Sequence, residues 1–230
     1  MPFSPPRIDE ASIAEVVDTL KSGWITTGPK TKEFERKISE YCGARKTICL
    51  NSGTAAMQMM LYWYGVGPGD EVIIPAYTYC ATANIVEHCK ATIKMVDVNR
   101  EEFNISVKAV RNAITEKTKV IIPVDIGGLP CDYDALMELV NEDAIKEQFA
   151  AKNQHQKKLG RILVLADAAH SFGASYKGRQ SGVLADASAF SFHAVKNLTT
   201  AEGGALVLNL PEAFDVEEIY AYMNTMSLHG

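Results

Sequence analysis

Short apolar runs alternate with helical patterns along most of the chain, and this alternation constrains the fold more than any other feature. Most of the runs lack the alternation of polar and apolar residues that marks a strand with one solvent-exposed face. This lack of alternation is typical of strands covered on both faces. Strands that alternate with helices predict an α/β domain around a largely parallel sheet. We predict seven strands: Lys46–Leu50, Glu71–Pro75, Ile93–Val98, Val120–Ile126, Ile162–Asp167, Ser188–Phe192 and Ala205–Asn209.

Helical periodicity fills the intervals between these runs. We predict helices at Glu10–Lys21, Thr31–Tyr41, Thr54–Tyr64, Ala81–Cys89 and Ser106–Ile114, and one long helix that starts at Asp134. The polar run Lys152–Lys158 is interpreted as a solvated helix end or a surface insertion. Only Ala194–Gly203 separates the last two strands, which is too short for a helical crossover, so we expect one antiparallel strand. The expected architecture is a three-layer α/β/α domain with roughly seven strands.

The composition excludes several classes of protein. The 230 residues are 47% hydrophobic and carry a formal net charge of −5, unlike the basic surface of a nucleic-acid-binding protein. No apolar run approaches the roughly 20 residues of a membrane span, and Met1–Arg7 lacks the apolar core of a signal peptide. The five cysteines include no Cys-x-x-Cys pair, which favours reduced thiols over disulfides or a metal site. We therefore expect a cytoplasmic protein that binds neither nucleic acid nor membrane.

A run of small and hydroxylated residues follows the first strand and opens the next helix. It reads Asn51-Ser-Gly-Thr-Ala-Ala56. Small residues let backbone N–H groups approach an anion, and the helix dipole favours negative charge at this end. Taken alone, the run favours an ordinary N-cap, in which a hydroxyl satisfies free N–H groups, and it also suits a phosphate site.

Two further strand ends carry polar residues. Asp167 ends a buried strand at the edge where open α/β sheets bind ligands, and a carboxylate buried there needs a cation or donors. His170, three residues later, has the chemistry of a structural neighbour, a metal ligand or a cofactor contact. Lys196 follows another strand by four residues, among small, aromatic and hydroxylated residues. Such surroundings would desolvate its ammonium and make the amine a nucleophile, whereas an isolated lysine there would face solvent.

These three features together describe one ligand. Pyridoxal phosphate requires a phosphate-binding site, a carboxylate to pair with its pyridinium nitrogen and a desolvated lysine to react with its aldehyde. Tyr77 and Tyr79, which follow the strand Glu71–Pro75, are candidates to stack on its ring. The sequence therefore predicts a pyridoxal-phosphate site and no metal site.

Several segments in this order and spacing are specific to one family. They are Ser52–Met57, Pro75–Asn84, Asp167–Gly173, Phe190–Asn197 and Glu202-Gly-Gly204. With them the chain resembles the DegT/StrS-type sugar aminotransferases, a group of fold-type-I pyridoxal-phosphate enzymes, from Gly23 to Gly230. The resemblance implies that Lys196 is the catalytic lysine that forms the Schiff base.

The resemblance also implies the cofactor contacts. Asp167 would pair with the pyridinium nitrogen, His170 would lie beside the ring hydroxyl, and Tyr79 would stack on the ring. Contacts to the phosphate would come from Gly53, Thr54, Ala55 and Ser191.

The activity that the resemblance implies is transfer of an amino group from a donor such as glutamate to a keto group of a nucleotide-linked sugar. The family works as a homodimer with shared active sites. Some members are dehydratases in which His replaces the lysine, so the presence of Lys196 favours transamination. Three alternatives stay open: a pyridoxal-phosphate dehydratase or lyase, an aminotransferase for a cyclic ketone without a nucleotide, and a non-catalytic fragment or regulatory domain.

Two features depart from the family pattern. Relatives commonly have His-x-x-Gly after the fourth strand, whereas this chain has Asp125-Ile-Gly-Gly-Leu-Pro130, so the usual substrate preference need not hold. Family members also continue into a smaller C-terminal domain, which this sequence would lack. We therefore expect residues 1–230 to form N-terminal helices and a large cofactor-binding domain, with little activity from this chain alone.

Overall fold

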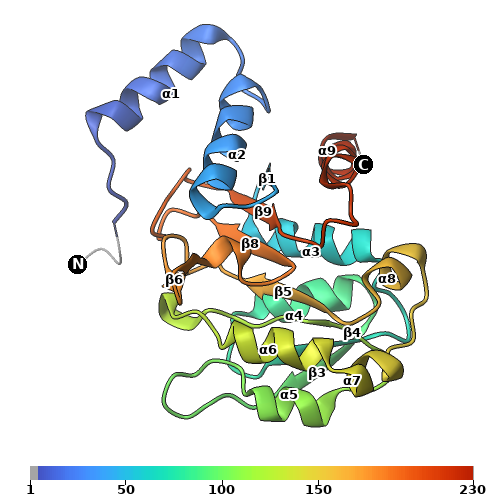
Figure 1. The fold of residues 1–230 in the computed structure, drawn as a ribbon. Coiled ribbons are helices and arrows are strands. Elements are labelled where there is room, and N and C mark those ends of the chain that lie inside the picture. The colour runs from blue at the N-terminus through green and yellow to red at the C-terminus, as the bar shows by residue number, and fades with distance from the viewer. Residues whose placement is uncertain (1–4, 230) are drawn as a thin grey trace.

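A seven-stranded sheet lies at the centre of the molecule (Figure 1). The computed structural model describes residues 5–229. Residues 1–4 of the segment Met1–Arg7, which lacks the apolar core of a signal peptide, and Gly230 lie outside the described residues. Across the sheet the strands are β1 (Lys46–Leu50), β9 (Gly204–Leu208), β8 (Ala187–Ser191), β5 (Leu163–Asp167), β4 (Thr118–Ile121), β2 (Glu71–Pro75) and β3 (Thr92–Val96). β9 is antiparallel to both of its neighbours, and every other adjacent pair is parallel. The expected fold class and the expected antiparallel strand are confirmed.

Two apolar cores lie on opposite faces of the sheet, because the central strands are apolar on both sides. Leu163 and Leu165 of β5 belong to one core, while Val164 and Ala166 belong to the other, as the two-residue repeat of a strand requires. The first core is covered by α3 (Gly53–Tyr64), α4 (Cys80–His88) and α9 (Val216–His229). The second is covered by α2 (Pro29–Cys42), α5 (Val107–Ala113), α6 (Tyr133–Asn141) and α7 (Asp143–Gln148). The result is the predicted three-layer architecture.

The prediction of one long helix from Asp134 is wrong. The segment forms α6, α7 and α8 (Gln154–Leu159). Glu142 separates the first two with an extended backbone, ψ 136°, and its carboxylate accepts from Arg111 of α5 at 2.7 Å. An ion pair with a distant helix therefore accompanies the break, and local periodicity does not report such a contact.

The polar run Lys152–Lys158 is only partly a solvated surface. Asn153 caps α8, and Gln156 within it is fully buried. The side-chain amides of Asn153 and Gln156 both donate to the carbonyl oxygen of Tyr64, at 2.9 and 3.1 Å. Tyr64 ends α3, where carbonyl groups lack intrahelical partners. The run therefore satisfies the end of another helix.

β4 ends several residues before the predicted limit at Ile126. The apolar run continues through Pro123, which has no N–H to donate to a ladder. Beyond it the chain still follows β5, because Val124 forms a bridge with Asp167 and the Asp125 N–H donates to the Asp167 carbonyl at 3.1 Å. A short helical turn, η1 (Ile126–Gly128), comes next. Asp125 therefore lies beside the carboxyl end of β5.

The remaining elements do not belong to the seven-stranded sheet. They are α1 (Glu10–Ser22), the hairpin β6 (Ser175–Tyr176) and β7 (Arg179–Gln180), and the turn η2 (Ser181–Val183). α1 extends away from the sheet (Figure 1), and none of its residues is buried. Within residues 5–229, no helix is both long and apolar enough to cross a membrane.

Candidate cofactor-binding site

The predicted site residues gather at one edge of the sheet. β1, β2, β5 and β8 run in the same direction, so their carboxyl ends lie at the same edge, where α/β sheets bind ligands. Asp167 ends β5 and Ser191 ends β8, while α3 and α4 begin just after β1 and β2. The topology thus brings together segments that are far apart in the sequence.

The N-terminus of α3 combines a cap with free N–H groups. Ser52 is the N-cap, and its hydroxyl accepts from the Ala55 N–H at 3.0 Å. The N–H groups of Gly53 and Thr54 have no acceptor among the described residues, as expected in the first turn of a helix. The capping interpretation is therefore correct, and it leaves two donors available for an anion.

Strands β8 and β9 press directly against this helix end. A Cβ on Gly53 would lie 3.1 Å from the Phe190 carbonyl oxygen and 3.3 Å from the Ser191 Cβ. A Cβ on Gly204 would lie 2.3 Å from the Ser52 carbonyl carbon. Ser191 therefore lies beside the free N–H groups, as a further phosphate contact would require.

Asp167 is a buried carboxylate without a cation. Its side chain accepts from the Thr82 hydroxyl at 2.8 Å and from the Ala169 N–H at 3.3 Å. Within the described part of the chain, no Lys, Arg or His nitrogen lies within ion-pair distance of it. Burial raises the pKa of Asp167, and the hydrogen bonds and the charges of His170 and Lys196 oppose that rise. A carboxylate held in this way is stabilised by a cation that enters the site, so it fits the pyridinium nitrogen of pyridoxal phosphate.

Lys196 lies close enough to Asp167 for their charges to interact. Its side chain is half-buried, and burial lowers the pKa of the amine while the Asp167 carboxylate raises it. The neighbouring Asn197 amide donates to the carbonyl oxygens of His170 (3.4 Å) and Phe172 (3.2 Å). The loop that carries the lysine is therefore bound to the turn that follows Asp167.

His170 and Tyr79 lie on the open side of these groups. The His170 side chain is exposed, and partial removal from water together with the Lys196 charge lowers its pKa. Tyr79 is 76% exposed and caps α4 three residues before Thr82, so it shares a helix face with the residue that binds Asp167. Tyr77 packs on Phe103 instead, with ring centroids 5.5 Å apart. Of the two candidates, Tyr79 is the one left free to stack.

Sequence reasoning missed Thr82, Asn197 and Ser171. Thr82 follows Tyr79 by one helical turn within a segment that was singled out, and this spacing is the signal that could have found it. Asn197 and Ser171 adjoin the predicted Lys196 and His170, but nothing local indicates what they bind. In the part of the chain that the structure describes, no cluster of His, Cys, Asp and Glu side chains is arranged to hold a metal ion.

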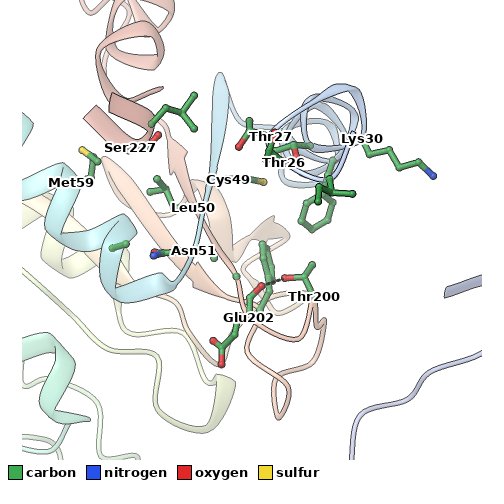
Figure 2. Close-up of a pocket in the computed structure, with 18 residues that line it drawn as sticks. Thr26, Thr27, Lys30, Cys49, Leu50, Asn51, Met59, Thr200, Glu202 and Ser227 are labelled. Carbon is green, nitrogen blue, oxygen red and sulfur yellow. Dashed lines mark hydrogen bonds between the residues drawn. The ribbon is translucent and has the colours of Figure 1, made fainter. Parts of the chain in front are cut away.

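A hollow of about 860 Å³ lies next to the α3 N-terminus (Figure 2). Thr26 and Thr27 from the loop before α2, Asn51 after β1, and Thr200 and Glu202 from the loop after Lys196 line it. Ala55 is the only predicted site residue among its lining residues. The hollow therefore adjoins the predicted cofactor contacts and does not surround them.

Comparison with known proteins defines the class. Residues 6–230 match the DegT/DnrJ/EryC1/StrS aminotransferase family, and the chain belongs to that family. It is 40% identical over its whole length to the uncharacterized protein MJ1066 of Methanocaldococcus jannaschii, covering 54% of that protein. It is 38% identical to the spore coat polysaccharide biosynthesis protein SpsC of Bacillus subtilis, covering 53% of it. The chain thus spans about half the length of these relatives.

Solved structures give the same result. The chain superposes on the putative sugar aminotransferase Spr1654 of Streptococcus pneumoniae in its PLP form with a TM-score of 0.96 and 52% identity, over 100% of this chain and 58% of that one. It superposes on PseC of Helicobacter pylori, an aminotransferase of pseudoaminic acid biosynthesis, with a TM-score of 0.82 and 29% identity, over 100% of this chain and 56% of that one. The fold is that of the sugar aminotransferases.

Proposed function

We propose that this chain forms the large, cofactor-binding domain of a pyridoxal-phosphate-dependent aminotransferase, with helices at its N-terminus. The observation that carries the proposal is the buried Asp167 carboxylate, with the Lys196 amine close to it. Among residues 5–229 this carboxylate has two donors and no cation within ion-pair distance. The family match and the PLP form of the Streptococcus pneumoniae relative support the choice of cofactor.

Each residue has a distinct task in this proposal. Pyridoxal phosphate, when bound, supplies an electron-accepting ring that lets a proton leave the carbon bearing the amino group. Asp167 would keep the ring nitrogen protonated through its negative charge. Lys196, whose amine has a lowered pKa, would hold the cofactor at its aldehyde carbon with release of water. Once the amine of the substrate displaced it, the free lysine amine would take up and return the proton at the reacting carbons.

The other contacts orient the ring. The free N–H groups of Gly53 and Thr54, with Ala55 and Ser191 beside them, would hold the phosphate at the positive end of α3. Tyr79 would lie against the ring face, and His170 would lie beside the ring hydroxyl. These contacts would hold the reacting carbon close to Lys196, which is the geometry that rapid proton transfer needs.

The proposed reaction moves an amino group from glutamate to a keto group of a nucleotide-linked sugar. The hollow of about 860 Å³ beside the site is within the size range of small-molecule sites, and its threonine hydroxyls and Glu202 carboxylate suit a polyhydroxylated substrate. We include a homodimer and a cytoplasmic location in the proposal. The family resemblance and the exposure of Tyr79 on the open side of the site support the dimer, and the five free thiols support the location.

One alternative acceptor has a specific observation behind it. The chain superposes with a TM-score of 0.81 and 33% identity on 3-amino-5-hydroxybenzoic acid synthase, whose name describes a product without a nucleotide. An acceptor screen should therefore include cyclic ketones as well as nucleotide-linked keto-sugars. Retention of both Lys196 and Asp167 weighs against the dehydratase and the non-catalytic alternatives.

Borohydride trapping tests the cofactor assignment. Protein mixed with pyridoxal phosphate should turn yellow, and reduction should fix the cofactor covalently to Lys196, where peptide mapping will find it. Lys196→Ala should abolish the label. Lys177→Ala, which removes an exposed lysine paired with Asp134, should keep it. A label on another lysine, or no label on the wild-type protein, would reject the proposal. The acceptor screen with glutamate as donor then tests the substrate class.

A further inference from the structure

A second buried carboxylate lies behind the proposed cofactor contacts. Asp125 is 1% exposed and follows β4, next to the end of β5. One carboxylate oxygen accepts from the Tyr133 hydroxyl at 2.8 Å and the Cys131 N–H at 3.0 Å. The other accepts from the Ser171 hydroxyl at 2.6 Å. Like Asp167, it has no ion-pair partner among residues 5–229.

Ser171 connects this carboxylate to the turn that carries His170. It is fully buried, and its N–H closes the turn by donating to the Ala168 carbonyl at 3.0 Å. Its own carbonyl accepts from the Ser181 hydroxyl at 2.6 Å. Gly128, three residues after Asp125, lies so close that a Cβ there would be 2.9 Å from the His170 carbonyl oxygen. The turn therefore lies against the Asp125 segment at Gly128 and is hydrogen-bonded to it through Ser171.

We propose that Asp125 is a positioning residue of the cofactor site, which acts through Ser171 to fix the turn between Asp167 and His170. This inference rests on the proposed function, because the turn matters only if its side chains contact a cofactor. A short hydrogen bond from a hydroxyl to a carboxylate is stronger and more directional than one between neutral groups. It therefore restrains the turn on which the Asp167 carboxylate and the His170 ring depend for their orientation.

The burial of Asp125 favours this role over simple packing. A buried carboxylate without a cation costs folding free energy unless donors offset it. Two of its donors, Tyr133 and Cys131, lie at and just before the start of α6, and they would suffice for a structural anchor. The third donor ties the same carboxylate to the site, and positioned groups act only when neighbouring residues fix their geometry.

Two matched variants separate positioning from packing. Ser171→Ala and Tyr133→Phe each remove one fully buried hydroxyl from the same carboxylate, so both should lower the melting temperature. Ser171→Ala should also weaken the affinity for pyridoxal phosphate about tenfold. This is the lower end of the loss seen when a hydrogen bond that supports a ligand-binding residue is removed. It should shift the visible absorption band of the bound cofactor as well. Tyr133→Phe should keep the wild-type band and an affinity within about twofold of wild type.

The measurements are cofactor titration, absorption spectra and thermal unfolding of protein expressed from its complete reading frame. If Ser171→Ala does not fold, Asp125→Asn is measured in its place. The asparagine amide has the same shape and keeps an oxygen that accepts from Tyr133, but it has no charged oxygen to accept from Ser171. If the wild-type protein binds the cofactor and the two variants have equal affinities and spectra, the inference about Asp125 is overturned and the proposed function stands. Wild-type protein that binds no pyridoxal phosphate would overturn the proposed function and this inference with it.

Discussion

The close approach of β9 to the α3 N-terminus gives a sharp prediction for Gly204→Ala. Gly204 begins β9 and pairs with Leu50 and Ser191 on its two sides. An added Cβ would lie 2.3 Å from the Ser52 carbonyl carbon and 2.4 Å from the Gly53 nitrogen. Both are backbone atoms, so no side-chain rotation relieves the overlap. The N-terminus of α3 must move.

The magnitude follows from that overlap. Reaching an ordinary contact of 3.4 Å from 2.3 Å requires a displacement of about 1 Å. Overpacking of this kind costs about 1–3 kcal/mol, which lowers the melting temperature of a chain of this size by about 2–12 °C. A displacement of about 1 Å in a positioned group costs up to about a hundredfold in function. Because the displaced N–H groups belong to the proposed phosphate-binding site, the affinity for pyridoxal phosphate should fall at least about tenfold.

The assay is thermal unfolding with and without pyridoxal phosphate, followed by cofactor titration. Gly67→Ala is the matched control, because a Cβ there meets no atom within 4 Å and the residue has no left-handed backbone. The control should unfold at or slightly above the wild-type temperature. A Gly204→Ala protein with wild-type melting temperature and cofactor affinity would refute the idea that β9 fixes the proposed phosphate-binding site.

Two further predictions concern the buried carboxylates. Asp167→Asn should fold, because the amide oxygen still accepts a hydrogen bond from Thr82. Transamination should nevertheless slow by about a hundredfold or more, because the negative charge opposite the pyridinium nitrogen is lost. A single-turnover rate equal to that of the wild type would contradict the role of Asp167. Burial raises the pKa of Asp125 to about 6, so between about pH 4, the ordinary Asp value, and pH 6 the folded apoprotein holds more protons than the unfolded chain. Its stability should therefore fall as pH rises through this range and level off above it. Asp125→Asn should reduce that fall, and parallel curves of melting temperature against pH in the two proteins would contradict the reasoning.

Strand bounds could be predicted where local composition marks both ends of the strand. β1 and β2 match the predicted Lys46–Leu50 and Glu71–Pro75 because turn residues such as Gly43 and Gly69 precede them. The prediction failed at Glu142 and at Gln156 for one reason. At each position the side chain binds a partner distant in the sequence, Arg111 for the first and the Tyr64 carbonyl for the second.

The candidate residues of the site could likewise be read from the sequence. Asp167 is the last residue of an apolar strand, and Lys196 and the turn at Gly53 follow the ends of two others. The position of a residue relative to a strand end can be read from the local sequence. Their roles toward the cofactor stay predictions. The sequence by itself thus determined the fold class and which residues stand at the binding edge of the sheet.

Only the tertiary structure decided which groups meet there. Thr82 donates to Asp167 across 85 positions of sequence, and Ser171 donates to Asp125 across 46. These contacts depend on the strand order β5-β4-β2, which brings the segments that follow β4 and β2 to the same edge of the sheet as the end of β5. Hydrophobic periodicity reports which face of an element is buried, but it carries no information about which element lies against that face. The hydrogen bonds behind the cofactor site therefore emerge only once the sheet is assembled.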